Sequence, residues 1–417
     1  MTAKAGIDTA VIGGGLVGAS IVLRETLLGK NVLLIEPGAI GGGATFGNAA
    51  MIAVSEVLPM ASWSNIFSAP NMLPRPGRAL KIDPLYLPKL LPWLWRFGNA
   101  ANRRDVDRNS ALLSRLCARA RDATANLLKQ AQASDLLIDR DAVRVFRSRS
   151  HLEKSASAWE RRARLGVQFS LVGTADLKEL LPDLDVDAHV GVMVKNYHSL
   201  ANPQKAAAAL VAAAQERGAK VAAERVAKLE VSGKRASILT ASGLVIRAGK
   251  VVVSAGAHSR GLALSVGDGI PLETERGYHV QFRKPGISLD RAYAFVDEEV
   301  AVAPIESDIR FCSFMEFAGL KKPPVKKRFG EIVAKARLLF PDLNVDSASC
   351  WMGHRPSLPD SLPVIGPSRS AENVFFCFGH GHLGVTLAAV SADILCGIMN
   401  DGRLNADFEA LLPDRFL

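Results

Sequence analysis

The sequence contains few cysteines, and they form no recognisable pattern. The five cysteines of the 417 residues include no CxxC pair and no spacing typical of metal ligands; they are Cys117, Cys312, Cys350, Cys377 and Cys396. An iron–sulfur pattern is absent as well. We therefore predict no metal site, and we expect reduced, mostly buried thiols of a cytoplasmic protein.

Long hydrophobic runs are also missing. No run reaches the roughly 20 apolar residues that a membrane-spanning helix needs, and the last candidate, residues 384–399, is interrupted by Asp393. No basic region precedes the apolar stretch near the N-terminus, so we expect no signal peptide. With 48% hydrophobic and 22% charged residues, the composition is that of a globular protein, and the length allows two or three domains.

Acidic residues are outnumbered by basic ones, and the formal net charge is +10. Residues 101–170 hold 15 Lys or Arg against 8 Asp or Glu, and residues 321–328 contain a second basic cluster. The first region has an amphipathic helical pattern, and no nucleic-acid-binding motif accompanies either region. We interpret both as solvated faces that also attract anionic substrates, and we predict no nucleic-acid partner.

The first 36 residues carry the clearest functional pattern. A short apolar run at residues 10–12 predicts a buried strand. It is followed by the spacing GxGxxG at Gly13, Gly15 and Gly18, and then by a helical pattern. These glycines permit a tight turn, close approach of a pyrophosphate, and close packing of helix on strand. A second apolar run ends at Glu36, placed to accept hydrogen bonds from a ribose, so the combination predicts dinucleotide binding.

A glycine-rich loop over residues 37–56 follows the second predicted strand. Its backbone N–H groups and the Thr45 hydroxyl are suited to holding phosphate, although a flexible surface loop has the same composition. The density of small residues directly after Glu36 favours cofactor contact.

Residues 59–98 are rich in proline and aromatic residues, and we interpret them as an insertion rather than a regular element. The segment 85–95 is apolar with basic edges. Two interpretations stay open: contact with a membrane surface, and packing over the active site. In the first case the protein would lie peripherally at the inner face of the cytoplasmic membrane.

The rest of the chain alternates between helical and strand patterns. Asn202 and Pro203 predict a helix start, and Ser232-Gly233 predicts a turn between two antiparallel strands. The expected elements are helices at 105–133, 176–181, 203–217, 329–340 and 385–399, and strands at 142–146, 167–171, 221–231, 236–246, 250–253, 278–282, 301–305 and 309–314.

Taken together, these residues resemble the D-amino-acid oxidase and dehydrogenase superfamily of FAD-dependent enzymes, most closely the bacterial D-amino-acid and D-hydroxyproline dehydrogenases. The resemblance covers essentially the whole chain. The motifs that carry it are Gly13 to Gly18 with Glu36, GATFGNA at 43–49, RGYH at 276–279, WMGHRP at 351–356 with Pro359-Asp360, PVIG at 363–366 and GHGHLGVT at 379–386.

The resemblance implies an α/β fold: an FAD-binding Rossmann-like domain with a discontinuous antiparallel-sheet α+β substrate domain. The FAD-binding domain is expected from residues 1–85, 201–270 and 351–417. The substrate domain, with the insertion, is expected from residues 86–200 and 271–350. The substrate pocket would lie between the two domains.

The resemblance also implies the residues that bind FAD. Beyond the three glycines of the turn and Glu36, they are Ala44, Thr45, Asn48, Ala49, Val226, Ala255, Gly256, Gly353, Gly381, His382, Leu383, Gly384 and Thr386. The final helix would direct its positive end at flavin N1 and C2=O. Relatives that attach FAD covalently use a cysteine at the position aligned with Gly353, so non-covalent FAD is predicted.

For the substrate, the resemblance points to Arg355, whose guanidinium can bind an α-carboxylate bidentately. Tyr278 would add its hydroxyl to the same carboxylate, or it is a core residue of its strand. His380 and His279 would line the pocket, although a lone histidine is more often structural. Arg355, Tyr278 and His380 are therefore the predicted catalytic residues.

The implied reaction is oxidative deamination of D-amino acids, in which a hydride passes from Cα to flavin N5 and the imine hydrolyses to a 2-oxo acid. Two alternatives stay open: a D-hydroxyproline or cyclic imino acid dehydrogenase, and the flavin subunit of a hetero-oligomeric amine dehydrogenase. The insertion favours a membrane quinone as electron acceptor. An amino or imino acid is the expected small-molecule substrate.

Overall fold

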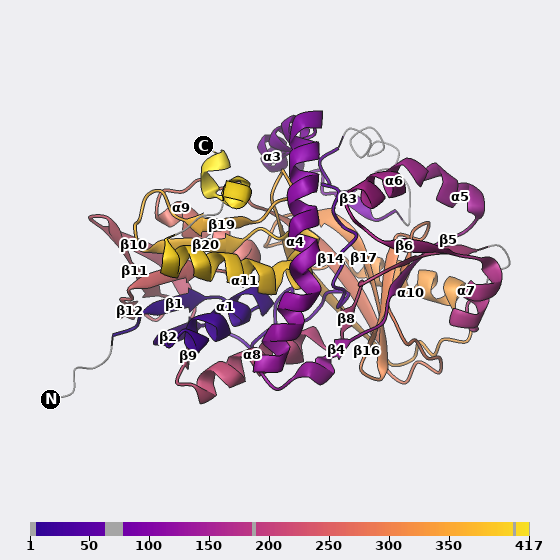
Figure 1. Cartoon of the computed structure of the whole chain (residues 1–417), viewed down its shortest axis with the longest axis horizontal. Coiled ribbons are helices and arrows are strands. Elements are labelled where there is room, and N and C mark those ends of the chain that lie inside the picture. Colours follow the sequence, from indigo (N-terminus) through magenta and orange to yellow (C-terminus); the bar gives the residue numbers. More distant parts are fainter. Residues whose placement is uncertain (1–5, 63–77, 186–188, 403–405, 417) are drawn as a thin grey trace.

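Two β-sheets lie side by side, and a long helix crosses the region between them (Figure 1). The computed structural model describes residues 6–62, 78–185, 189–402 and 406–416. We call the unit built on the six-stranded sheet the parallel-sheet domain, and the unit built on the nine-stranded sheet the large-sheet domain. The N- and C-terminal regions both belong to the side of the parallel-sheet domain.

The parallel-sheet domain is built on six strands in the order β19-β20-β13-β1-β2-β9. All neighbouring pairs are parallel except β19 with β20. The strands are β1 (Thr9–Ile12), β2 (Val32–Ile35), β9 (Lys220–Ala222), β13 (Lys250–Val253), β19 (Val364–Pro367) and β20 (Val374–Phe378). Central strands of such a sheet are buried on both faces, and β1 is buried at all four of its positions.

Three helices pack together beside this sheet: α1 (Leu16–Leu27), α8 (Pro203–Glu216) and α11 (Gly384–Asp401). The predicted start of α8 is confirmed, because the Asn202 side chain accepts hydrogen bonds from the N–H groups of Gln204 and Lys205. The expected final helix is also confirmed, within two residues at each end.

The expected antiparallel pair at 221–231 and 236–246 is confirmed in part. A separate three-stranded sheet contains β10 (Val226–Ser232), β11 (Arg235–Thr240) and β12 (Val245–Ile246), with the turn at the predicted place. Residues 220–222, however, form β9 and pair in parallel with β2. The sequence could not show that the chain passes from one sheet to another here, because both segments are extended and have the same strand pattern. The short helix α9 (Ser259–Ser265) follows β13.

The large-sheet domain has nine strands, mostly antiparallel, in the order β18-β14-β17-β16-β15-β5-β7-β6, with β3 beside β17. The strands are β3 (Leu80–Ile82), β5 (Ala142–Phe146), β6 (Phe169–Val172), β7 (Val190–Val194), β14 (Glu273–Phe282), β15 (Tyr293–Phe295), β16 (Val300–Ile305), β17 (Asp308–Phe317) and β18 (Ala348–Ser357). A two-stranded ribbon, β4 (Leu137–Ile138) with β8 (Ser199–Leu200), lies apart from it. The antiparallel sheet expected between 271 and 350 is therefore confirmed.

Helices cover the large sheet at its far end (Figure 1). An apolar core that includes Tyr278, Phe282 and Phe311 packs against α10 (Lys326–Leu339) and α7 (Thr174–Leu180). The helices α5 (Arg149–Lys154) and α6 (Ala156–Arg164) lie beside β5, and Trp159 of α6 is buried.

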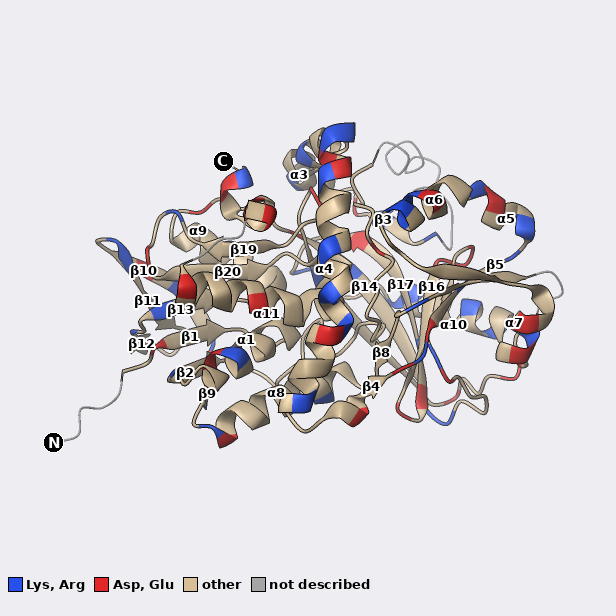
Figure 2. Cartoon of the chain, in the orientation of Figure 1, with Lys and Arg blue, Asp and Glu red and all other residues tan. Residues whose placement is uncertain are grey.

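The long helix α4 (Arg103–Gln130) confirms the expected amphipathic helix and packs against α11 and α8. Basic and acidic residues alternate along its outer surface (Figure 2). Several pair with one another, as in Arg108 with Asp105 and Arg161 of α6 with Asp107. This arrangement agrees with a solvated charged face.

The prediction that residues 59–98 contain no regular element is wrong for their second half. Residues 87–100 form α3 (Leu87–Ala100). Pro88 lies in the first turn, where no N–H is needed, and Pro92 leaves one carbonyl without its helical donor on an exposed side. The part of this prediction that falls on residues 63–77 lies outside the described residues.

Within the described ranges, one helical stretch, Gly381–Asp401, is long and apolar enough to cross a membrane by length and composition. From the sequence we expected Asp393 to interrupt the apolar run at residues 384–399, but this stretch passes the criterion although it contains Asp393. Most of it, 72% of its most apolar window, is buried inside the protein, where α11 packs against α1 and α4. A core helix has the same features.

The sheets place the domain boundaries differently from the sequence-based division. β18 spans the predicted boundary at 350/351 and pairs with β14 along its whole length. Residues 80–82, expected in the FAD-binding domain, form β3 on the large sheet. Pro356 is accommodated in β18 because this strand lies at one end of the sheet order, where a proline is tolerated.

Candidate functional site

The turn between β1 and α1 depends on two glycines. Gly13 has φ +107°, and a Cβ there would lie 2.6 Å from the carbonyl oxygen of Ser254. A Cβ on Gly18 would lie 1.9 Å from the carbonyl oxygen of Gly13. The turn therefore presses against β13 and α1 so closely that no side chain fits at either position. Gly15 precedes the helix without a side-chain cap, so the positive N-terminus of α1 is open to an anion.

Glu36 is fixed beside this turn at the carboxyl end of β2. Its carboxylate accepts hydrogen bonds from the N–H of Gly14 (2.7 Å) and the N–H of Gly38 (3.0 Å). The Thr45 hydroxyl accepts a hydrogen bond from the N–H of Leu16 in the first turn of α1 (3.0 Å). A half-buried carboxylate next to a helix N-terminus in which only the first N–H is bonded, by Thr45, suits a ribose and a pyrophosphate. These residues therefore fit the adenosine end of FAD.

The loop over residues 43–49 is held by the large-sheet domain through three successive carbonyl groups. Arg310 Nη1 donates to the carbonyls of Phe46 (2.7 Å) and Asn48 (2.8 Å). His279 Nδ1 lies 2.9 Å from the carbonyl of Gly47. Within the loop, the Asn48 side chain bonds backbone groups on both sides of it. The backbone path of the loop is thus set across the domain junction.

Arg310 is a residue that the sequence-based prediction missed. It is 2% exposed, its Nε and Nη2 donate to the side-chain oxygen of Gln281, and its guanidinium lies over the ring of Phe46. It makes no ion pair with a carboxylate among the described residues. Burial lowers the pKa of Arg310. The strand was predicted, but nothing in the local pattern showed that this arginine points at the loop.

Trp351 is a second residue missed by the prediction. Its ring fills the space between Gly47 and Gly353, where an added Cβ would lie 1.9 and 1.8 Å from ring atoms. The ring also stacks on His279, with centroids 5.3 Å apart. Gly353 thus lies under an aromatic ring, and its predicted contact with the cofactor stays a prediction.

Alternation along β14 and β18 decides which side chains share a face. The pairing is regular from Glu273 to Phe282, so Arg355 lies on the same face as Glu275, Gly277 and Trp351. Its Nη1 donates to the carbonyl of Phe314 (2.9 Å), and its guanidinium lies over Gly277, where a Cβ would be 2.5 Å from Nη2. Arg355 is therefore displayed on the face of the sheet that carries His279 and Trp351.

The structure does not bring Tyr278 to Arg355. Tyr278 points to the opposite face, into the apolar core beneath α10, and its hydroxyl donates to Glu316 and accepts from the N–H of Val325. Burial, followed by the hydrogen bond to Glu316, raises the pKa of Tyr278 to about 12. Of the two interpretations of Tyr278, this position supports the core residue.

Cys350 likewise lies on the face opposite Gly353, because the two positions are three residues apart on one strand. No other cysteine lies in β18. The remaining four cysteines are buried, as expected. The strand thus presents no thiol on the face of Arg355.

The segment from Gly379 to Thr386 forms the turn that opens α11. His380 is buried, its Nε2 lies 2.9 Å from the Ser391 hydroxyl, and burial lowers its pKa to about 4. His382 is exposed, and Leu383 precedes the helix without a side-chain cap. The Thr386 hydroxyl accepts a hydrogen bond from the N–H of Ala53 (2.9 Å). The N-terminus of α11 is thereby joined to the chain that follows the 43–49 loop.

The other predicted cofactor residues lie after β13, at the start of β10, and in or next to the 43–49 loop. Ala255 and Gly256 directly follow β13, and Gly256 has φ +55°. Val226 is the first residue of β10, shortly after the end of β9 in the chain. Ala44 lies in the 43–49 loop, and Ala49 directly follows Asn48 at its end. Their contacts with a cofactor stay predictions.

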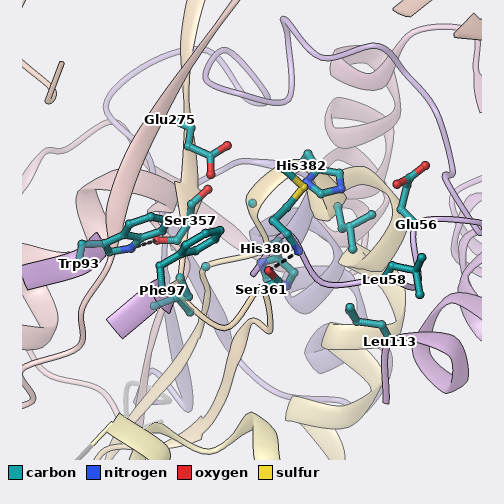
Figure 3. A pocket seen from close by; sticks show the side chains of 15 residues that line it. Glu56, Leu58, Trp93, Phe97, Leu113, Glu275, Ser357, Ser361, His380 and His382 are labelled. Atoms are coloured by element: carbon teal, nitrogen blue, oxygen red, sulfur yellow. Dashed lines mark hydrogen bonds between the residues drawn. The ribbon is translucent and has the colours of Figure 1, made fainter. Parts of the chain in front are cut away.

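A narrow cavity lies between the start of α11, the end of β18 and helix α3 (Figure 3). Its charged and polar lining includes Glu56, Glu275, His380 and His382, and its apolar lining includes Leu58, Met60, Trp93, Phe97, Leu113, Leu358 and Leu383. Glu275, Trp93 and Phe97 lie on one side in Figure 3, and Glu56 and His382 on the other.

Glu56 lines this cavity and also contacts two arginines of the large-sheet domain. It pairs with Arg144 of β5, and Arg162 of α6 lies 4.0 Å away. Burial by itself would raise the pKa of Glu56, but Arg144, Arg162 and His382 together outweigh it and lower the pKa to about 2. Glu56 is therefore a fully ionised and compensated carboxylate.

No cluster of His, Cys, Asp or Glu able to hold a metal ion occurs in the part of the chain that the structure describes. The groups present instead suit an organic cofactor with two phosphates along the parallel-sheet domain and a reactive end near Arg355 and α11.

Comparison with known proteins gives a family match over most of the chain. Residues 8–398 match the family model described as FAD dependent oxidoreductase. A protein of Bradyrhizobium diazoefficiens named D-amino-acid oxidase is 31% identical over 99% of both chains. A protein of Methylobacterium radiotolerans named D-amino acid dehydrogenase is 26% identical over 94% of this chain and 95% of its own.

Solved structures share the fold at low sequence identity. Glycine oxidase from Geobacillus kaustophilus matches with a TM-score of 0.76 and 18% identity, covering 98% of this chain and 99% of its own. L-proline dehydrogenase from P. horikoshii matches with a TM-score of 0.74 and 17% identity, covering 99% and 98%. These matches confirm the expected arrangement of a Rossmann-like domain with an antiparallel-sheet domain.

Proposed function

Because this chain belongs to the family of FAD-dependent oxidoreductases, we propose that it catalyses the oxidative deamination of D-amino acids. The observation that carries the proposal is the position of Arg355, displayed on the sheet face between the 43–49 loop and the start of α11. A guanidinium there supplies the planar pair of donors that an α-carboxylate accepts. The names of the curated relatives support the D-amino acid as substrate.

Bound FAD would supply the acceptor for the hydride that leaves Cα. The protein's part is to orient the substrate and to shape the field around it. Arg355 would hold the carboxylate, and so would fix the direction of the Cα–H bond. The uncapped N-terminus of α11 would stabilise negative charge that develops in front of it.

The site needs no strong general base, provided that the amine arrives deprotonated. His380 is neutral at physiological pH, because burial lowers its pKa to about 4. It therefore adds no positive charge beside the substrate amine. The product imine would then be hydrolysed by water to the 2-oxo acid.

The proposal is tested by anaerobic reduction of the purified holoenzyme with a panel of D- and L-amino acids, including cis-4-hydroxy-D-proline and sarcosine. We expect bleaching of the flavin absorbance by D-amino acids. Arg355→Ala should raise KM by about 100-fold, since a charge-assisted contact is worth about 1.5–3 kcal/mol. Arg355→Lys should recover part of the loss. A bound flavin that no amino acid reduces would refute the proposed reaction.

We further propose that the electron acceptor is a membrane quinone reached through contact of α3 with a lipid surface. Three apolar side chains of this region are exposed to 89%, 55% and 72%, namely Leu85, Leu91 and Trp95. Basic residues flank them: Lys89 and Arg96 in α3, and Lys322, which pairs with Asp83. An apolar ridge with basic edges suits an anionic membrane interface.

Flotation of the holoenzyme with anionic phospholipid vesicles tests this contact. We expect binding that Leu91→Glu with Trp95→Glu abolishes, because two charges would have to enter the interface. The matched control is Leu171→Glu, a change at a similarly exposed leucine of β6 on the large sheet. Equal binding by both variants, or quinone reduction unaffected by the α3 changes, would contradict the proposal.

A further inference from the structure

We propose that Glu275 is the anionic end of a subsite for a positively charged substrate side chain, so that basic D-amino acids are the preferred substrates. The inference rests on the proposed function, since it concerns what the site selects. It starts from a buried carboxylate that has no hydrogen bond or ion pair among the described residues.

Glu275 is the third residue of β14 and is 6% exposed. Its side chain lines the cavity at the start of α11 (Figure 3). Among the described residues it has no hydrogen bond and no ion pair. Its strand neighbour Glu273 differs, because it accepts a hydrogen bond from Tyr86 and lies 3.9 Å from Arg260.

A buried carboxylate without a cation carries a large desolvation cost. The other carboxylate of the cavity, Glu56, is compensated by Arg144 and Arg162. Glu275 is therefore the carboxylate without an ion pair among the described lining residues, because its cross-strand neighbour Arg355 is turned away over Gly277. A ligand that brings a positive charge into the cavity would remove most of this cost.

The walls around Glu275 suit a cation on an aliphatic stem. Trp93 and Phe97 of α3 stack with centroids 5.2 Å apart, and both line the cavity. Aromatic faces attract ammonium and guanidinium groups, while Leu58 and Leu358 suit methylene groups. The cavity is narrow, about 20 Å³, so the stem would have to displace a flexible side chain such as Met60.

The spacing from Arg355 also favours a side-chain cation over the α-ammonium. Glu275 is the direct cross-strand partner of Arg355, but the guanidinium of Arg355 is turned over Gly277, two residues or about 7 Å along β14 from Glu275, and makes no ion pair with it. An extended basic side chain spans such a distance from its α-carboxylate. A carboxylate beside the α-ammonium would also hold it in the charged form, which cannot lose a hydride.

The experiment compares two ligands that cannot be oxidised at Cα: 6-aminohexanoate, with a carboxylate and a distal ammonium, and hexanoate, with the carboxylate alone. Binding to the holoenzyme is read from the perturbation of the flavin absorbance. We expect 6-aminohexanoate to bind about 10- to 100-fold more tightly than hexanoate, the range for a charge-assisted contact. Glu275→Gln should remove this preference and leave hexanoate binding unchanged.

The matched control is Glu273→Gln, on the same face of β14 but already paired with Tyr86. It should keep the preference for 6-aminohexanoate. In turnover, kcat/KM for D-arginine and D-lysine should fall in Glu275→Gln, while kcat/KM for D-methionine and D-norleucine should not.

Two outcomes would overturn the inference: equal binding of both ligands to the unaltered enzyme, or an equal loss for every D-amino acid in Glu275→Gln. The second would assign Glu275 to the α-ammonium. If no D-amino acid reduces the flavin, the proposed reaction fails by itself, and the ligand pair still tests Glu275.

Discussion

At the residue scale, the buried Arg310 is one of the side chains that connect the two domains. Its guanidinium donates hydrogen bonds to the side chain of Gln281 and to the carbonyls of Phe46 and Asn48. A guanidinium offers five donors in a fixed plane, so it can hold several acceptors of one loop at once. We expect the loop to be pre-formed before FAD binds, which lowers the entropic cost of binding.

Arg310 can be tested apart from turnover. Arg310→Lys should weaken FAD binding by about 10-fold or more, since a lysine cannot serve Gln281 and two carbonyls together, and each lost hydrogen bond costs about 1 kcal/mol. FAD affinity is measured by titrating the apoprotein and following flavin fluorescence. Arg291→Lys, at an arginine that pairs with Asp290 on the same domain, is the control and should leave FAD affinity unchanged. Equal FAD affinities of the two variants would contradict the proposed role of Arg310 in holding the 43–49 loop.

Histidine burial gives a pH dependence that is also decided at single residues. The pKa of His380 is lowered to about 4 in the folded protein, against about 6.5 in an unfolded chain. Between these pH values the unfolded state binds the proton more readily. The stability that the neutral histidine contributes is therefore full above pH 6.5 and is lost as the pH falls towards 4.

We therefore predict that His380→Gln flattens the dependence of unfolding free energy on pH. Between pH 7 and pH 5 the difference from the unaltered protein should be on the order of 2 kcal/mol. Urea denaturation at each pH measures it. His279 and His354, with pKa values lowered to about 4, should keep part of the slope in the variant. An unchanged slope would show that His380 titrates normally.

At the scale of elements, the contact of α1 with β1 is the tightest part of the cofactor domain. The helix approaches the strand so closely that a Cβ at Gly18 would meet the Gly13 carbonyl at 1.9 Å. The clash is with backbone and not with a movable side chain. Any side chain there must push the helix N-terminus away from the phosphate position.

Gly18→Ala should therefore lower stability by about 1–3 kcal/mol and weaken FAD binding together, as overpacking does in a tight core. Thermal unfolding and FAD titration measure the two effects. Gly397→Ala in α11 is the control, because no atom lies within 4 Å of its added Cβ. It should be neutral or slightly stabilising, since alanine favours the helix. Comparable losses in both variants would disprove the close-contact argument.

Several elements were predictable because their signals are local. The helix at Asn202-Pro203 has its cap and proline adjacent in the sequence, and the alternation in β16 and β17 is read within a few residues. Helix α3 was not predictable, since its prolines argue against a helix. Its buried side, Leu90 and Trp93, packs against Phe317 of β17, and this tertiary contact outweighs the local cost.

At the scale of the whole molecule, the site is assembled from segments far apart in the chain. The 43–49 loop, β14, β18 and the start of α11 meet only because the two sheets lie side by side, with α4 crossing the region between them (Figure 1). Glu275 and Trp93, separated by 182 residues, line one cavity for the same reason. The pocket between the domains was expected from family resemblance, but its charge was not.

The sequence alone determined the cofactor class, because the turn at Gly13 to Gly18 and the carboxylate of Glu36 lie within one short stretch whose geometry is local. It also determined the reaction class, through motifs matched along the whole chain. Only the tertiary structure decided which side chains of β14 and β18 share a face, and so separated Tyr278 from Arg355. It alone placed Arg310 on the loop and Glu275 in the cavity, because burial and partners depend on how distant segments pack.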